Sequence, residues 1–183
     1  FDRVVRREPT AALKLLNKMS IFFDYAYLRQ ESLERHQRAM AAISNLDELP
    51  YDTRARLFGT MANLHLDSHR TEEAMHWYEK SMAIRREELN KVVHSGADDA
   101  TQLPIKRQLA GSLHNIALAY ISMDRLEEAW ALVCEAADIN RSIENDSWLA
   151  RNLNVLSYLS LHSGNLSEAL RLCEHLIARV RPL

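Results

Sequence analysis

Three stretches of the sequence share one pattern: RTEEAMHWYEKSMAI (70–84), RLEEAWALVCEAADI (125–139) and NLSEALRLCEHLIAR (165–179). Each opens with polar residues, continues with Glu followed by Ala, and then carries apolar residues every three to four positions. That spacing is typical of an amphipathic helix. A pattern that returns along a chain indicates a repeat architecture, so the three copies are aligned here on their shared Ala.

A second helix-forming stretch ends just before each copy, at LFGTMANLHLDSH (57–69), LHNIALAYISMD (113–124) and LNVLSYLSLHSG (153–164). In each, one large apolar residue is followed three positions later by another, and then at once by a small residue. Because a small side chain lets two helices approach closely, we expect the stretches to form antiparallel helix pairs. The residues of this pattern are Phe58, Met61 and Ala62, then Leu113, Ile116 and Ala117, then Leu153, Leu156 and Ser157.

A degenerate copy precedes these three, at residues 15–43, and Ser32 takes the place of the shared Ala. The aligned residues are Ser32, Ala74, Ala129 and Ala169. Successive copies lie roughly forty residues apart, with a longer step between the second and the third. The sequence therefore predicts an all-α chain of four helix pairs, with a lengthened helix and a loop in the longer step.

These repeats resemble the tetratricopeptide repeat, a helix–turn–helix unit that stacks into a superhelix. The resemblance implies a right-handed α-solenoid of four such antiparallel pairs, the first of them degenerate. A step of about forty residues exceeds the common repeat length of about 34 and is similar to a long variant found in bacterial signalling and transcription-regulating proteins. We expect one domain over residues 1–183, with a capping helix at 1–8 and repeats at about 13–45, 54–94, 105–145 and 148–181.

Short polar segments mark the expected helix ends. Side-chain oxygens of Ser, Thr and Asp satisfy the first free N–H groups of a helix. The expected N-caps are Asp52 or Thr53, Thr101 and Ser147. Gly164 is expected to stop a helix, because glycine adopts the left-handed conformation without steric cost. The segment 94–104 is expected to be a loop.

The composition fits one ordinary globular core: 183 residues, 47% of them hydrophobic, with a net charge of −2. That charge gives no reason to expect direct nucleic-acid binding. No apolar run is long enough for a membrane span, and no signal peptide is visible. Cys134 and Cys173 lie in apolar helical stretches, so we expect reduced core thiols and a cytoplasmic protein. The chain begins with Phe1 and ends in helical register, so we expect a fragment of a longer protein.

No catalytic motif is visible, so we expect neither an enzyme nor a cofactor. The carboxylate pairs Glu72/Glu73 and Glu127/Glu128 fall at helix starts, where negative charge favours the helix dipole. His65 and His69 have a spacing that a zinc site uses, but no third ligand lies at a diagnostic distance, so we favour no metal.

The resemblance implies a concave groove lined by the first helix of each pair. The residues that it places there are Arg56, Asn63, Asp67, His114, Asn115, Leu118, Arg151, Asn154, Tyr158 and His162. Asn63, Asn115 and Arg151 match three of the five clamp residues with which some members of this family hold a chaperone's C-terminal carboxylate. Gly59 and Val155 replace the expected cations. Another protein or peptide segment is therefore the favoured ligand.

The function that we expect is non-catalytic recognition of a partner segment, by a sensory or scaffolding domain that lies beside an output domain of a regulatory protein. Two alternatives stay open. One is homodimerisation through the last helix pair, where Leu170, Leu176 and Ile177 lack a following repeat. The other is a small-metabolite sensor that uses Arg151, His114 and Tyr158.

Overall fold

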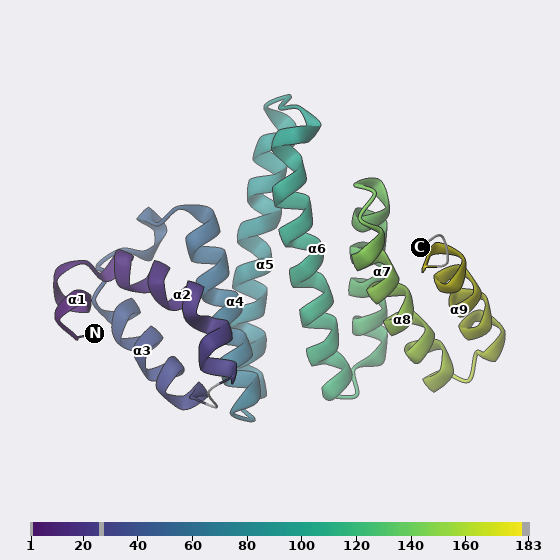
Figure 1. Cartoon of the computed structure of the whole chain (residues 1–183), viewed down its shortest axis with the longest axis horizontal. Helices are drawn as coiled ribbons and strands as arrows, with labels where there is room; N and C mark the ends of the chain where they lie inside the picture. Colours follow the sequence, from purple (N-terminus) through teal and green to yellow (C-terminus); the bar gives the residue numbers. More distant parts are fainter. Residues whose placement is uncertain (1, 26–27, 181–183) are drawn as a thin grey trace. The chain divides into compact units, whose positions relative to one another are not determined.

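A computed structural model of the chain describes the backbone of residues 2–25 and 28–180, and this part consists of helices joined by short connections, with no strand. The α-helices, labelled in Figure 1, are α1 (Asp2–Arg7), α2 (Pro9–Tyr25), α3 (Arg29–Ala41), α4 (Tyr51–Asp67), α5 (Thr71–His94), α6 (Asp99–Ser122), α7 (Leu126–Ser142), α8 (Asp146–His162) and α9 (Leu166–Val180). A 3-10 turn, η1 (Leu46–Glu48), lies between α3 and α4. The prediction of an all-α chain built from helix pairs is confirmed. The pairs are α2/α3, α4/α5, α6/α7 and α8/α9.

The chain divides into two compact units, residues 1–88 and 89–183, with the boundary inside α5. In the first unit, side chains from α2, α3 and α4 form one apolar core around Leu13, Leu33 and Leu57, each at most 1% exposed. The ring of Phe58 on α4 lies 5.2 Å from that of Trp77 on α5. Ser81 Oγ on α5 donates a hydrogen bond of 2.7 Å to the backbone oxygen of Ala55, which ties the two helices together.

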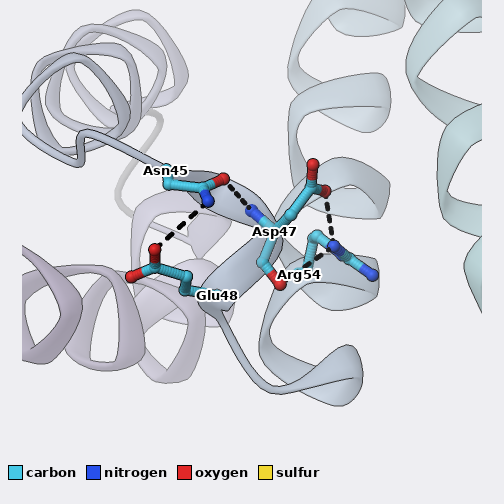
Figure 2. Close-up of polar contacts among 4 residues, drawn as sticks. All are labelled: Asn45, Asp47, Glu48 and Arg54. Atoms are coloured by element: carbon cyan, nitrogen blue, oxygen red, sulfur yellow. Dashed lines mark hydrogen bonds and ion pairs between the residues drawn. The ribbon is translucent and has the colours of Figure 1, made fainter.

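The connection between α3 and α4 is held by a small polar cluster, shown in Figure 2. Asn45 Oδ1 accepts a 3.0 Å hydrogen bond from the backbone N–H of Asp47, and Asn45 Nδ2 donates to Glu48 Oε1 at 3.2 Å. Arg54, in the first turn of α4, donates to Asp47 Oδ1 at 2.6 Å and to the Asp47 backbone oxygen at 3.3 Å. The cluster therefore fixes η1 against the start of α4.

The second unit packs α6, α7, α8 and α9 around a second apolar core. Its centre is made of Ala117, Ala129, Val133 and Leu149, all fully buried. The aligned small residues are buried as the repeat pattern predicts: Ala74 and Ala129 at 0%, and Ala169 at 3%. The large residues that the pattern placed beside them, among them Leu113 at 0% and Leu153 at 2%, are buried too.

The turns that end α4, α6, α7 and α8 have the same backbone form. A residue with positive φ follows each helix: His69 at 58°, Asp124 at 59°, Glu144 at 52° and Gly164 at 76°. The next residue's N–H then donates back to the carbonyl five positions earlier, as from Arg70 to His65 at 2.9 Å and from Asn165 to Ser160 at 2.8 Å. This is the Schellman arrangement, which satisfies carbonyls at the helix end. The expected stop at Gly164 is confirmed.

The expected N-caps are wrong in each case, because the helices begin earlier. The N-caps are Pro50 for α4, Asp98 for α6 and Asn145 for α8. The expected loop over 94–104 is also shorter than predicted. Asp98 Oδ1 accepts hydrogen bonds from Thr101 N at 3.0 Å and Thr101 Oγ1 at 2.6 Å, so α6 already begins at Asp99 and Pro104 lies inside it.

Cys134 is half-buried, and Cys173 is exposed rather than a core thiol; both are free. Leu176 and Ile177, named above for self-association, have side chains outside the described residues. None of the helices described combines the length and the apolar character needed to cross a membrane.

Gly111, in the middle of α6, provides a test of the helix assignment. A Cβ added there would meet nothing within 4 Å, so Gly111→Ala should stabilise the chain by about 1 kcal/mol through helix propensity alone. A matched change, Gly164→Ala, should destabilise it by about 1 kcal/mol, because φ at Gly164 is +76°. Urea unfolding followed by circular dichroism measures both, and equal shifts in one direction would contradict the assignment.

Candidate functional site

The second unit presents a continuous exposed face on its two first helices, α6 and α8. On α6 the exposed residues Arg107, Asn115, Leu118 and Ser122 recur every three to four positions once the half-buried Gly111 is included. Four exposed residues of α8 have the same spacing of three to four positions: Arg151, Asn154, Tyr158 and Leu161. Leu118 is 44% exposed, Tyr158 43% and Leu161 53%, so this face carries apolar side chains as well as polar ones.

Arg151 lies over the ring of Trp148, which contacts His114 of α6. Its guanidinium carbon lies 5.2 Å from the centre of the Trp148 ring, within the range of a cation–π interaction. The Trp148 ring in turn meets the His114 ring edge to face, with centroids 5.5 Å apart and planes at 88°. One tryptophan therefore covers His114 of α6 and supports the cation of α8.

Beneath these rings lies a buried chain of amide hydrogen bonds through three helices. Asn145 Nδ2 donates to Asn140 Oδ1 at 3.1 Å, and Asn140 Nδ2 donates to Asn152 Oδ1 at 2.9 Å. Asn152 Nδ2 then donates to His114 Nδ1 at 3.1 Å. Asn140 is 1% exposed and Asn152 is 0% exposed. We call these four residues the amide ladder. Because the amide nitrogen of Asn152 can only donate, Nδ1 of His114 accepts this hydrogen bond. The His114 ring is therefore neutral and carries its proton on Nε2.

His114 was expected in the groove, but the structure places it under Trp148, where it is only 7% exposed. Burial lowers the pKa of His114 below its ordinary value, and the positive charge of Arg151 lowers it further. Burial is also the main cause that lowers the pKa values of His36 and His65.

The lowered pKa values of these histidines predict that the chain loses stability in acid. Since the folded state prefers neutral His114, the stability from that preference is present above the ordinary pKa of 6.5 and is lost as the pH falls below it. We expect the free energy of unfolding to fall between about pH 7 and about pH 5.5, as measured by urea titrations at each pH. His114→Gln keeps an acceptor for Asn152 but does not titrate, so its pH slope should be smaller. An unchanged slope would rule out a contribution from His114.

The groove residues predicted in the first unit are largely engaged within that unit. Arg56 pairs with Asp52 at 3.3 Å, and Asp67 pairs with Arg29 at 3.2 Å. Asn63 Oδ1 accepts a hydrogen bond from Tyr78, whose pKa is raised to about 12, chiefly by burial. A cavity of about 340 Å³ lies beside these groups, and its lining includes Arg29, Ser32, Thr60, Asn63, Leu64, Leu66 and Asp67.

In the second unit, the remaining predicted residues are exposed. Asn115, Leu118, Arg151 and Asn154 lie on the face described above, and the Tyr158 and His162 rings contact each other with centroids 4.4 Å apart. Within the described residues, no three His, Cys, Asp or Glu side chains are grouped so that they could hold a metal ion. The thiol of Cys134 has a raised pKa, chiefly because it is partly buried, so it is a poor nucleophile.

Three contributors to this site were not found from the sequence. Arg107 was missed although the helical spacing from Asn115 would have placed it on the same face. Trp148 was missed because it lies outside the aligned repeat pattern, in the first turn of α8. Asn152 carries no sequence signal for its buried hydrogen bonds, because its partners come from α6 and α7.

Two family models match the chain, and both describe a tetratricopeptide repeat. One covers residues 54–95, which span α4 and α5, and the other covers residues 110–143, which span most of α6 and all of α7. Residues 54–95 and 110–143 are tetratricopeptide repeats. The repeats at these two positions are the pairs that the aligned Ala74 and Ala129 predicted. No curated protein sequence matches the chain significantly.

Solved structures of tetratricopeptide-like proteins share the fold. BtubC from P. vanneervenii matches with a TM-score of 0.73 at 16% identity, over 100% of this chain and 68% of its own. A putative kinesin light chain from Podosopora anserina matches with a TM-score of 0.72 at 17% identity, over 97% of this chain and 79% of its own. Aspartyl phosphate phosphatase F from Bacillus subtilis matches with a TM-score of 0.74 at 15% identity, over 94% of this chain but only 41% of its own. The likeness establishes an α-solenoid fold.

Proposed function

We propose that the chain is a non-catalytic binding module that recognises a segment of a partner protein along the exposed face of α6 and α8. In this proposal it acts as a sensory or scaffolding domain of a cytoplasmic regulatory protein. The observation that carries the proposal is the composition of this face. Leu118, Tyr158 and Leu161 are each more than two-fifths exposed, and the exposed amides of Asn115 and Asn154 lie on the same helices.

Such a face suits recognition of an extended segment. Aromatic side chains dominate the affinity of protein interfaces, and Tyr158 provides one beside the aliphatic Leu118. Side-chain amides can pair with the backbone N–H and C=O groups of a bound segment, because an amide both donates and accepts. The fold supports the proposal, because stacked repeats present such extended surfaces.

A displayed library of random peptides, selected on the purified chain, tests the proposal. Peptides that bind the parent should lose most of their affinity for the double variant Asn154→Ala, Tyr158→Ala. The matched control is Leu166→Ala, Leu170→Ala, which removes two exposed apolar side chains from α9 instead. If the α9 variant loses binding and the α8 variant keeps it, the proposed face is wrong.

Self-association is a second candidate, favoured by one observation on α9. Leu166 is 63% exposed and Leu170 is 65% exposed, one helical turn apart. By the repeat alignment they correspond to Leu126 and Trp130 of α7, which are half-buried beside Leu159 and Ser160 of α8. Light scattering that gives a dimer mass for the parent and a monomer mass for the α9 variant would support this candidate.

A further inference from the structure

We infer that the second unit also binds a small organic amine, in a cavity formed by α7, α8 and α9. The ligand class is a protonated amine with an apolar body. The inference goes beyond the proposed function, because the cavity uses other residues of α8 than the exposed face does. Its lining includes Leu126, Glu127, Trp130, Leu159, Ser160, Ser163, Asn165 and Glu168.

The cavity has the size and the apolar walls of a small-molecule site. Its volume is about 520 Å³, and ligand pockets typically have volumes of about 300 to 1,000 Å³. Leu126, Leu159 and the ring of Trp130 provide the apolar part of the lining. Leu126 and Trp130 are only half-buried, and Glu127 and Asn165 are exposed, so a ligand can enter the cavity from solvent.

A buried hydroxyl group without a partner belongs to this lining. Ser160 is 1% exposed, and its Oγ makes no hydrogen bond to the described residues. A buried polar group without a partner is costly, so a ligand that pairs with it gains affinity. Ser163 Oγ donates its hydrogen to the Ser160 backbone oxygen at 3.0 Å. The Ser163 hydroxyl can therefore only accept a hydrogen bond from a ligand.

The charge of the lining is negative. Among its described residues, the ionisable side chains are Glu127 and Glu168, with no Lys, Arg or His. Glu168 accepts hydrogen bonds from Arg171 at 2.8 and 2.6 Å. Glu127 makes no ion pair with any residue that the structure describes. The lining therefore favours a cation over an anion, and Glu127 is the carboxylate available to pair with it.

A protonated amine with an apolar body matches these features together. Its ammonium group offers three N–H donors, for the Glu127 carboxylate and for the hydroxyl oxygen of Ser160. A cation that lies against the face of an aromatic ring is attracted to it, most strongly for tryptophan, and Trp130 provides such a ring. The apolar body gains free energy by removing its own surface and that of Leu126 and Leu159 from water.

Three compounds of matched size test the inference: phenethylamine, phenethyl alcohol and hydrocinnamate. They place an ammonium, a hydroxyl and a carboxylate group on the same apolar body. Each is titrated into the purified chain at neutral pH while NMR follows the indole N–H signal of Trp130, which is assigned by its loss in Trp130→Phe. The amine should bind roughly five-fold more tightly than the alcohol, and the carboxylate should bind more weakly than either.

Variants of the lining separate the effect of charge from that of apolar contact. Glu127→Gln should weaken amine binding roughly five-fold and leave alcohol binding nearly unchanged. Ser160→Ala removes the buried hydroxyl without adding volume and should weaken amine binding by a similar factor. The matched control is Glu128→Gln, because Glu128 is paired with Arg125 at 2.8 Å and is not part of the lining. It should change amine binding little.

Several outcomes would overturn the inference. They are an alcohol or carboxylate that binds as tightly as the amine, a loss in Glu128→Gln as large as that in Glu127→Gln, and a Trp130 signal that none of the compounds shifts. Amine binding that neither Glu127→Gln nor Ser160→Ala weakens would also contradict it. The peptide-binding face is tested separately by the displayed library. Thermal melts show that each variant is folded before binding is measured.

Discussion

Asn152→Leu is expected to lower the free energy of unfolding by about 3 kcal/mol. Asn152 is fully buried, and its amide is the link of the amide ladder between Asn140 and His114. Leucine has a similar size but no polar atoms, so the change leaves Nδ1 of His114 without its donor and removes an acceptor from Asn140. Each buried polar group left without a partner costs about 1 to 3 kcal/mol. Urea unfolding followed by circular dichroism measures the loss.

The matched control for this variant is Asn154→Leu, two positions along α8 on the exposed face. Its amide makes no hydrogen bond to the described residues, so stability should change by no more than about 0.5 kcal/mol. Similar losses in both variants would show that leucine disturbs α8 in general and that the ladder contributes little. A larger loss in Asn152→Leu assigns the difference to the buried hydrogen bonds.

Leu113→Ala should cost about as much, roughly 3 to 4 kcal/mol, because Leu113 is fully buried and its truncation leaves a cavity in a closely packed core. Leu118→Ala, five residues later on the same helix, should cost less than about 1 kcal/mol, because that side chain is 44% exposed. Thermal and urea unfolding compare the two. In binding assays Leu118→Ala should lose more peptide affinity than Leu113→Ala, because Leu118 lies on the proposed face and Leu113 lies in the core. Equal effects on stability would contradict the assigned orientation of α6.

The helix pairs could be predicted because, within each repeat, the spacing of apolar and small residues along the sequence indicates which side of each helix is packed. Leu113, Ile116 and Ala117 already carry the information that one side of the helix is apolar and closely approached, and the structure buries all three. The first residue of each helix was harder to predict, because several neighbouring polar residues can cap a helix with similar stabilisation. Around α6, Thr101 was expected to cap, but it donates to Asp98 one turn earlier.

The site was only partly predictable for a related reason. His114 and Asn154 occupy corresponding positions in their repeats, yet one is buried and the other exposed. The difference comes from Trp148, which covers His114 from the neighbouring helix. Likewise Asp67 was expected to face a partner but pairs with Arg29 of α3. Contacts between side chains of different repeats depend on how the repeats pack. They cannot be predicted from the spacing of residues within one repeat.

The turns that end α4, α6, α7 and α8, each with a positive φ residue, have a consequence for engineering. His69, Asp124, Glu144 and Gly164 include an imidazole, two carboxylates and a glycine, yet the backbone hydrogen bonds around them are alike. The bend is thus set by hydrogen bonds of the main chain, and glycine adopts the positive φ at its tip with less strain than a residue with a side chain. Chimaeras joined at these points, for example the first helix of one pair grafted onto the second helix of another, should keep the bend. The same tips suit the attachment of a fluorophore or an affinity tag.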